Sequence, residues 1–348
     1  MSTPREHKTV QARILAYVEA IGWTIVSREE AERRRGFDPD VPPADRARNR
    51  SLYFDDLLDA KVREFNPRYA EGPGALPGQF RHLHTNIYGN REFVDHMRNR
   101  GKFFDHEEKR ERDLILIDYD SLAKNVFEVT EEWAFHNGHY GTREDVVFLI
   151  NGIPVLAIEC KNADKDEAIA LGVDQIRRYH RETPELFVSQ QFFTATDAIG
   201  FSYGATWNMV QRNIFNWKDK EVGKLEAKVK SFCAIPQMLA FLKDYIVFAE
   251  TDPKTCKAKS DVTKMWVAMH CLWQRARIEA GGHPLNVPLI GSGLSGIGLP
   301  SRDLLNLIVL SAITETKANR ITEVIRIVLH PDRFEEIDLR DVKKHWEE

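Results

Sequence analysis

The stretch REDVVFLINGIPVLAIECKNA, residues 143–163, decides how the fold of the whole chain is interpreted. Two apolar runs flank Asn151-Gly152. Asn-Gly is the strongest two-residue signal for a β-hairpin, because both central positions of a type I′ turn adopt positive φ. Pairing the two predicted strands about this turn places Asp145 near Glu159, at the end of the hairpin away from the turn.

Three charged side chains gather at that open end: Asp145, Glu159 and Lys161. Side chains alternate along a strand, so Glu159 and Lys161 share one face, and Asp145 reaches it if the register or a bulge allows. Two carboxylates held close together repel each other, and a divalent cation with oxygen ligands offsets that repulsion. A neighbouring lysine stabilises charge on a phosphate or positions a water molecule. The pattern therefore predicts a Mg²⁺ (or Mn²⁺) site for phosphodiester hydrolysis.

The same residues have a less specific interpretation, because a Glu-x-Lys pair often marks a solvated strand edge. The run IPVLAI that precedes Glu159 is apolar at successive positions. Such a run is typical of a central strand that is buried on both faces. A charged residue at the end of a central strand favours the functional interpretation over the solvated edge.

The remaining chain alternates between helical and strand patterns, which predicts an α/β fold. Helices are predicted over residues 9–23, 51–66, 92–101, 166–183, 234–250, 261–282 and 302–314. Strands are predicted over residues 113–120, 125–135, 186–197, 285–290 and 320–330, besides the hairpin. Residues 28–50, which carry ERRRG and RARNR, predict a mobile loop with a basic surface.

Composition narrows the class of protein. The 348 residues are 43% hydrophobic and 29% charged, and they contain no apolar run near the ~18 residues that a membrane helix needs. The N-terminal segment is too polar for a secretory signal, and the four cysteines form no C-x-x-C pair. We therefore expect a cytoplasmic protein. The formal net charge of −4 argues against a general basic coat, but not against a local basic groove.

The hairpin sequence resembles the N-terminal nuclease domain of the endonuclease (R) subunit of type I restriction enzymes, which belongs to the PD-(D/E)xK nucleases. The resemblance covers roughly residues 10–250 and includes a Q-x-x-x-Y element at Gln175 and Tyr179. It implies a restriction-endonuclease-like mixed sheet flanked by helices. It also implies that Asp145 and Glu159 bind the metal and that Lys161 is the catalytic lysine.

The resemblance also implies that Gln175 and Tyr179, with Arg178 beside them, bind DNA or support the site. The alternative for this helix is a packing face with a polar edge. Glu144 stands where the family often has proline before the aspartate, and Cys160 stands where it often has leucine. Neither is a ligand position.

Three further expectations follow from the resemblance. The family tends to carry a glutamate on its first helix, and Gln11 and Glu19 are both candidates for that position. DNA is the expected substrate, and the modification and specificity subunits of a restriction complex are candidate partners. The chain contains no G-x-x-x-x-G-K-[ST] loop, so we expect no ATP site and no ATP-driven motor in these residues.

The tail contains G-x-G-x-x-G at Gly291, Gly293 and Gly296, between a predicted strand and a predicted helix. This position suits a nucleotide-binding turn. The run resembles the second phosphate-binding loop of macro domains found with bacterial defence proteins, but only about residues 265–346 fit, so it predicts half a domain. The alternative is a Gly-rich turn that joins strand to helix without binding a ligand.

We therefore predict a PD-(D/E)xK nuclease domain over residues 1–220, a helical connector and linker over 221–262, and a partial macro-like βαβ unit over 263–348. The predicted function is Mg²⁺-dependent DNA cleavage. The alternatives are a nuclease-fold binding protein of weak activity, which acts through a partner or senses a nucleotide, and a truncated or recombined subunit.

Overall fold

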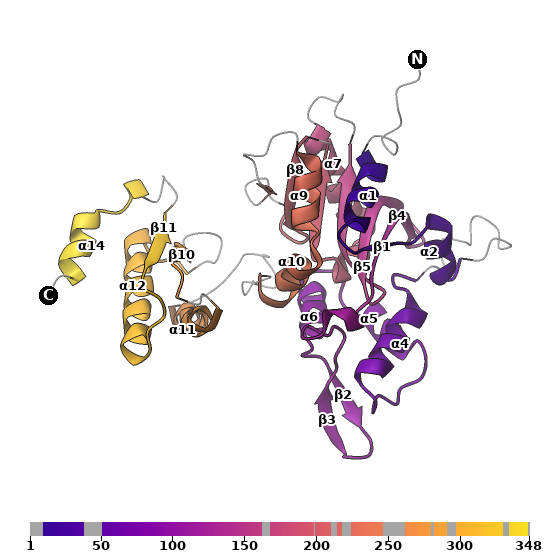
Figure 1. The fold of residues 1–348 in the computed structure, drawn as a ribbon, viewed down its shortest axis with the longest axis horizontal. Coiled ribbons are helices and arrows are strands. Elements are labelled where there is room, and N and C mark those ends of the chain that lie inside the picture. Colours follow the sequence, from indigo (N-terminus) through magenta and orange to yellow (C-terminus); the bar gives the residue numbers. More distant parts are fainter. Residues whose placement is uncertain are drawn as a thin grey trace. The chain divides into compact units, whose positions relative to one another are not determined.

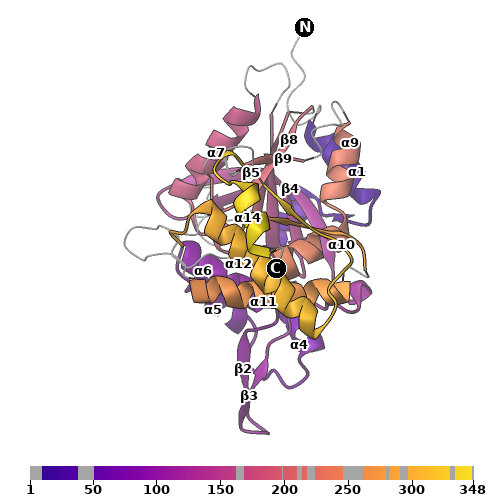
Figure 2. The ribbon, with the colours of Figure 1, turned by 90° about the vertical axis from the view of Figure 1, so that its left-hand side faces the viewer.

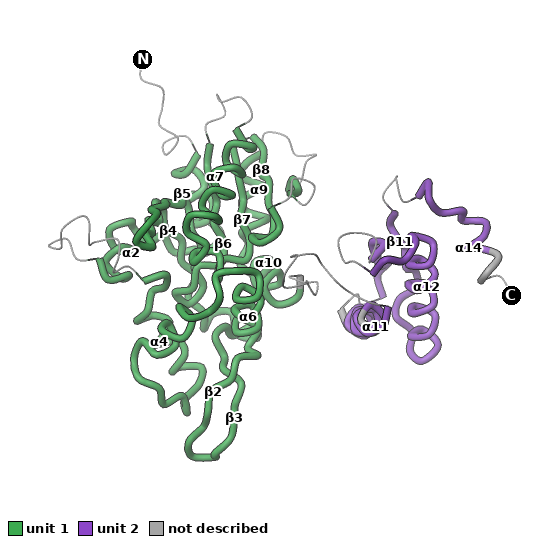
Figure 3. The backbone as a smooth tube through the Cα atoms, turned by 180° about the vertical axis from the view of Figure 1, so that it is seen from behind, with its two compact units in different colours: residues 1–246 green, residues 247–348 purple. Residues whose placement is uncertain are grey.

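The structure of the chain is a computed structural model that describes residues 10–37, 51–161, 168–197, 199–209, 214–217, 224–245, 262–279, 282–290, 297–329 and 334–346. The chain divides into two compact units, residues 1–246 and residues 247–348 (Figure 3). None of the helices within the described ranges is long and apolar enough to span a membrane.

In the described part of the first unit, seven strands form one mixed sheet in the order β1-β4-β5-β6-β7-β8-β9 (Figure 1). They are β1 Thr24–Ile25, β4 Phe127–His136, β5 Gly141–Ile150, β6 Ile153–Cys160, β7 Phe192–Thr196, β8 Phe201–Ala205 and β9 Phe215–Asn216. β4, β5 and β6 are antiparallel neighbours, whereas β6 and β7 run parallel across the connection through α7. The predicted α/β class with a mixed sheet is confirmed.

Helices cover both faces of this sheet, with α7 on one side and α1 with α9 on the other (Figure 2). The helices of the unit are α1 Ala12–Glu19, α2 Arg28–Arg34, α4 Asp55–Phe65, α5 Ala75–Arg81, α6 Ile87–Met97, α7 Ala168–Glu182, α8 Leu186–Ser189, α9 Leu225–Phe232 and α10 Ile235–Ala240. The 3₁₀ turn Leu122–Lys124 and the π-helical turn Phe241–Tyr245 complete the helical elements in the described residues. Val173 and Ile176 of α7 pack with Val147 and Leu149 of β5 in one buried core.

The predicted strand over residues 113–120 is wrong. Residues 114–120 form no strand, although their pattern is apolar. The Asn99 side chain accepts the amides of Leu116 and Ile117, at 2.9 and 3.3 Å, and the Asn66 side chain accepts the amide of Ile115 at 2.9 Å. These bonds satisfy the backbone from residues that are distant in sequence, so no ladder forms.

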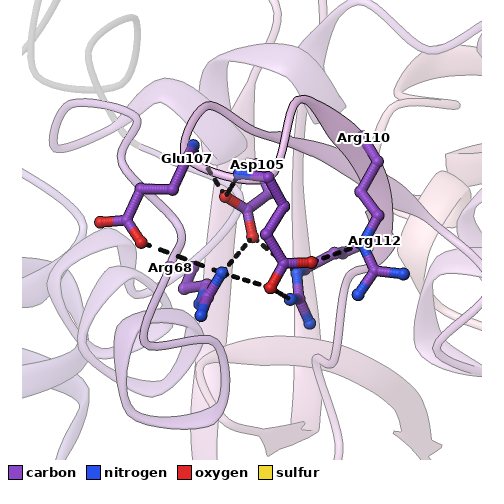
Figure 4. Close-up of polar contacts among 6 residues, drawn as sticks. Arg68, Asp105, Glu107, Arg110 and Arg112 are labelled. Atoms are coloured by element: carbon purple, nitrogen blue, oxygen red, sulfur yellow. Dashed lines mark hydrogen bonds and ion pairs between the residues drawn. The ribbon is translucent and has the colours of Figure 1, made fainter.

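Before this segment, β2 Lys102–Asp105 and β3 Arg110–Asp113 form an antiparallel hairpin that the sequence analysis does not predict. Asp105 is only 1% exposed. Its polar contacts hold the turn together (Figure 4). Its carboxylate accepts the amide of Glu107 at 3.0 Å, Arg112 Nε at 2.6 Å and Arg68 Nη1 at 3.1 Å. The buried charge of Asp105 is therefore balanced by Arg112 of the hairpin and by Arg68, which precedes it in the chain.

The predicted basic loop over residues 28–50 is wrong in its first part, because residues 28–34 form α2. Ser27 caps the helix by accepting the amide of Glu30 at 3.2 Å. Arg34 donates to Glu128 at 2.8 Å, and the buried Arg35 guanidinium lies 3.6 Å from the centre of the Trp133 ring. Both arginines therefore attach this segment to β4 and do not form a free basic surface. Residues 38–50, with the arginines of RARNR, lie outside the described residues.

The second unit contains α11 Val262–Glu279, β10 Leu285–Pro288, α12 Ser301–Ala318, β11 Ile325–Val328 and α14 Leu339–Trp346. β10 and β11 pair in parallel, with α12 between them in the chain, so the predicted βαβ unit is confirmed. Leu304, Leu305 and Ile308 of α12 are buried against α11, whose Trp273 donates to Ser311 Oγ at 2.9 Å.

α9 and α10, which the sequence analysis assigns to a connector, lie within the first compact unit, where α9 packs against α1. The division into three segments by residue number stays a prediction. Gly291, Gly293 and Gly296 lie outside the described residues.

Candidate active site

The predicted turn sets the geometry of the site. Asn151 and Gly152 both adopt positive φ, 52° and 81°, as a type I′ turn requires. A Cβ atom at Gly152 would lie 2.8 Å from the carbonyl oxygen of Phe54, so the close approach of that loop also demands glycine. From the turn, β5 and β6 pair as far as Val146 and Ile158. The next residues toward the open end are therefore Asp145 and Glu159.

The structure brings the three predicted site residues together at this open end. The backbone amide of Cys160 donates to Asp145 Oδ2 at 2.8 Å. Lys161 Nζ donates to Glu159 Oε1 at 2.7 Å and to the Cys160 carbonyl at 3.2 Å. All three charged side chains are buried, Glu159 most completely at 2% exposure. A buried group of two carboxylates and one ammonium is not a solvated strand edge.

The electrostatics of the pair favour a cation. Burial raises the pKa of both carboxyl groups, and the charge of Asp145 helps to hold the pKa of Glu159 well above its usual range. The Lys161 ammonium opposes this shift but supplies only one positive charge for two carboxylates. A divalent cation bound between the two carboxylates would stabilise the ionised form of both.

The donor set fits a hard metal ion. Asp145 and Glu159 offer carboxylate oxygens, which Mg²⁺ prefers. Within the described ranges, no group of three or more His, Cys, Asp or Glu side chains is arranged to hold a metal ion. A metal bound to this pair would complete its coordination with water and phosphate oxygens, as Mg²⁺ commonly does.

The Q-x-x-x-Y residues lie against the site. Gln175 Nε2 donates to Tyr179 Oη at 2.7 Å, and Tyr179 Oη donates to the carbonyl of Arg143 at 2.8 Å, two residues before Asp145. Burial and then the charge of Glu159 raise the pKa of Tyr179 to about 12, so the phenol stays protonated. The pair thus links α7 to β5. Arg178 instead lies on the exposed side, 3.6 Å from Glu182.

Gly172 explains how α7 comes so close, and the sequence analysis does not identify it. A Cβ atom at this position would lie 3.1 Å from Ala195 Cβ, 3.6 Å from Lys161 Cγ and 3.7 Å from Glu159 Cγ. A larger side chain would press on Ala195 of β7 and on the site residues at the end of β6. An isolated glycine inside a helical pattern is the sequence signal that could have identified this contact.

Glu132 is a second residue that the sequence analysis does not identify. It lies on β4 with φ of 56°, a left-handed conformation that few residues other than glycine adopt. Its charge acts on Asp145 and contributes to the raised pKa of that carboxyl group. No sequence signal marks this position, because the break in the ladder at Glu132 arises only when β4 pairs with β5.

The candidates for an acidic residue on the first helix are placed differently. The Gln11 side chain at the start of α1 is buried, and its Oε1 has no hydrogen-bond partner among the described residues. Glu19 at the end of α1 is exposed. The described contacts place neither side chain at the carboxylate pair.

Glu144, which stands beside Asp145, yields a prediction about stability. Gln190 Nε2 donates to Glu144 Oε2 at 2.7 Å, and burial raises the pKa of this carboxyl to about 7. The folded protein then holds a proton that the unfolded chain, with an ordinary carboxyl pKa near 4.5, releases. We expect the stability of the metal-free protein to fall as pH rises from about 4.5 to about 7, by up to about 3 kcal/mol from this group.

Urea unfolding in chelator at pH 5 and pH 7.5 measures this effect, with Glu144→Gln as the matched variant. Glutamine keeps an acceptor for Gln190 but cannot ionise. The variant should lose the share of the pH dependence due to Glu144 and keep that of Asp145 and Glu159, whose pKa values are also raised. An identical pH dependence in both proteins would show that Glu144 is not buried in this way.

Comparison with known proteins agrees with this architecture. Residues 3–209 match the family model described as Type I restriction enzyme R protein N terminus, and residues 240–330 match the model of the macro domain of Thoeris protein ThsA. The first match lies within the first compact unit, and most of the second match lies within the second unit.

Several curated relatives share the first region. The Type I restriction enzyme SauCOLORF180P endonuclease subunit of Staphylococcus aureus (strain COL) is 28% identical over 206 residues, 56% of this chain and 22% of that protein. The Putative type I restriction enzyme MjaVIIP endonuclease subunit of Methanocaldococcus jannaschii is 30% identical over 153 residues, 42% of this chain and 14% of that protein. This chain thus spans about a fifth or less of the length of these relatives.

The family match covers residues 3–209, more than half of the 348 residues, and it includes the hairpin, the carboxylate pair and the Q-x-x-x-Y helix. The chain therefore belongs to the family of the type I restriction enzyme R protein N terminus.

Proposed function

We propose that the first unit is a Mg²⁺-dependent DNA endonuclease of the PD-(D/E)xK type, similar to the R subunit of type I restriction enzymes. Asp145 and Glu159 are the proposed metal ligands, and Lys161 is the proposed catalytic residue. The proposal rests on one observation: these three groups are buried together at the end of the hairpin. Lys161 donates to Glu159, and the amide of Cys160, which lies between them in sequence, donates to Asp145. The names of the relatives, all endonuclease subunits, support it.

The residues of this chain have distinct roles in the proposed reaction. A bound Mg²⁺ (or Mn²⁺) would polarise a phosphoryl oxygen and lower the pKa of a water molecule. The Cys160 amide orients Asp145, and the Lys161 ammonium stabilises the negative charge that develops on the phosphate. Gln175 and Tyr179 position β5 through the Arg143 carbonyl. They are positioning residues in this proposal.

The proposal assigns phosphodiester hydrolysis, and no ATP turnover, to these 348 residues, which contain no phosphate loop of the G-x-x-x-x-G-K-[ST] kind. Modification and specificity subunits of a restriction complex are the proposed partners, because the curated relatives are named as endonuclease subunits of type I restriction enzymes. The direct test is conversion of supercoiled plasmid to nicked or linear DNA in Mg²⁺, with chelator as the blank. Cleavage that persists in chelator would contradict metal dependence.

A second candidate function is nucleotide sensing by the tail, which the match to the ThsA macro domain favours. We expect no tight binding of ADP-ribose or NAD by this chain. A pocket that binds such a ligand tightly must bury most of the ligand surface. In the described residues of the second unit, the sheet has only the two strands β10 and β11, which are too few to form the walls of such a pocket. The role we propose for the βαβ unit is structural.

A thermal shift assay with ADP-ribose tests this expectation. Ligand at 100 times its dissociation constant would add about 2.7 kcal/mol to stability, so a tight complex would raise the unfolding midpoint clearly. We expect no such rise. A rise that disappears in Gly293→Val would make the tail a nucleotide-binding unit.

A further inference from the structure

The ladder between β4 and β5 is interrupted at one place beside the candidate site. Glu131 pairs with Val146, and Trp133 pairs with Glu144, but the intervening residues, Glu132 and Asp145, are not paired. By count the two lie opposite each other on adjacent strands. A third acidic residue, Glu132, therefore lies across from Asp145 on the neighbouring strand.

Glu132 is held in an unfavourable backbone conformation. A non-glycine residue with φ of 56° costs on the order of 1 kcal/mol or more, and such strain collects at functional sites. The side chain is only 15% exposed, and its carboxylate faces two arginines from different elements. The strained residue thus serves as an anchor between α2 and the start of β5.

The two arginines share that anchor but remain accessible. Arg143 Nε lies 2.8 Å from Glu132 Oε2, and Arg28 Nη1 lies 3.9 Å from the same oxygen. Their side chains are 57% and 43% exposed, and Arg28 also lies 3.4 Å from Glu32. A guanidinium carries five N–H donors in a planar fork that fits phosphate oxygens, so a contact to one carboxylate leaves donors for a second anion.

Two other arginines of the first unit, Arg34 and Arg177, make close contacts within the protein. Arg34 is paired with Glu128, and both Nε and Nη2 of Arg177 donate to the Met209 carbonyl. A DNA phosphate that approaches the Asp145–Glu159 pair meets two carboxylates, whose repulsion must be offset by nearby positive charge. Arg143, two residues before Asp145 on β5, and Arg28, which shares its partner Glu132, supply half-exposed positive charge for this purpose.

We propose that Arg28 and Arg143, oriented by Glu132, form a binding site for a backbone phosphate of DNA beside the metal site. The inference rests on the proposed nuclease function and names the residues that receive the substrate. Glu132 is a positioning residue in this arrangement, because it acts through the arginines. The expected contact is with phosphate and not with a base, so it should not depend on sequence.

The test measures the affinity of the full chain for a short DNA duplex in chelator, where no metal-dependent cleavage intervenes, over a range of salt concentrations. Loss of one phosphate contact reduces the slope of log K against log salt by about 0.9. We expect Arg143→Ala and Arg28→Ala each to bind more weakly with a slope reduced by about one unit. Arg143→Lys should retain most of the slope, because the charge remains.

Arg100→Ala is the matched control, because Arg100 is an exposed arginine at the end of α6 that lies 3.3 Å from Asp95. Its slope should equal that of the unchanged protein. Wild-type slopes and affinities in both Arg28→Ala and Arg143→Ala would overturn the proposed phosphate site alone. If the unchanged protein binds no DNA in chelator but cleaves it in Mg²⁺, only the phosphate site falls; if it neither binds nor cleaves DNA, both proposals fall. If it binds DNA with the expected slopes but cleaves none in Mg²⁺, only the nuclease proposal falls.

Discussion

Lys161→Ala is expected to lower the rate of plasmid cleavage by about 10²–10³-fold, which is the usual effect of removing one group that stabilises charge in the transition state. The Lys161 ammonium is buried and lies 2.7 Å from Glu159 Oε1, two residues after that proposed metal ligand. A phosphate bound to a metal on Glu159 would therefore lie within reach of the same ammonium. The measurement is the initial rate of nicking in saturating Mg²⁺.

A second buried lysine supplies a matched control for this prediction. Lys228 on α9 is 4% exposed, and its Nζ donates to the carbonyl of Ile199 at 3.2 Å. Lys228→Ala removes a buried ammonium from the same unit, but not from the site. It should lower stability without changing the cleavage rate per folded molecule. Equal cleavage rates for Lys161→Ala and the unchanged protein would show that Lys161 only balances the charge of Glu159.

The hairpin could be predicted because its information is local. Asn151-Gly152 specifies the turn, and the apolar runs on both sides specify the strands, so the register at the turn fixes which residues meet at the open end. The observed hydrogen bonds of Asp145 and Lys161 agree with that arrangement. The helix with Gln175 and Tyr179 was also predictable, because a spacing of four residues places both side chains on one face.

The parts that were not predicted depend on contacts between distant residues. The apolar run over residues 113–120 has the pattern of a strand, but Asn99 and Asn66 take its amides, and only the folded chain brings them there. The interruption at Glu132 likewise appears only when β4 meets β5. Polar residues that bind backbone groups far away in sequence leave no periodic signal, so pattern analysis overlooks them.

The arginines at the end of α2 show that the exposure of charged residues is also hard to predict from sequence. A run of charges in the sequence predicts a solvated surface, because charged side chains are rarely buried. In the fold, Arg35 is buried over the ring of Trp133, and Arg34 lies 4.0 Å from the centre of the Phe54 ring. Guanidinium groups pack on aromatic faces at low cost in desolvation, so composition alone cannot separate a basic surface from a packed arginine.

Glu159→Gln is expected to change metal binding and stability in opposite directions. Loss of one of two carboxylate ligands should weaken Mg²⁺ or Mn²⁺ binding by well over tenfold, which corresponds to more than about 1.4 kcal/mol. Isothermal calorimetry measures this loss directly. In the unchanged protein, metal at 100 times its dissociation constant should add about 2.7 kcal/mol to stability, and this metal-dependent increase should be largely absent in the variant.

Without metal, the same substitution should make the protein more stable at neutral pH. Burial and the neighbouring Asp145 disfavour the ionised form of Glu159, as its strongly raised pKa indicates, and glutamine removes that cost while keeping an acceptor for Lys161. Lys161 and Asp145 then balance one to one. Glu128→Gln is the control, because Glu128 is a buried carboxylate paired with Arg34 at 2.8 Å, away from the site. Glu128→Gln should lower stability, because it leaves the Arg34 guanidinium without its charged partner, and it should leave metal affinity unchanged. A carboxylate retained only for structure would behave like Glu128, so equal Mg²⁺ affinity in Glu159→Gln and the unchanged protein would end the assignment of Glu159 as a ligand.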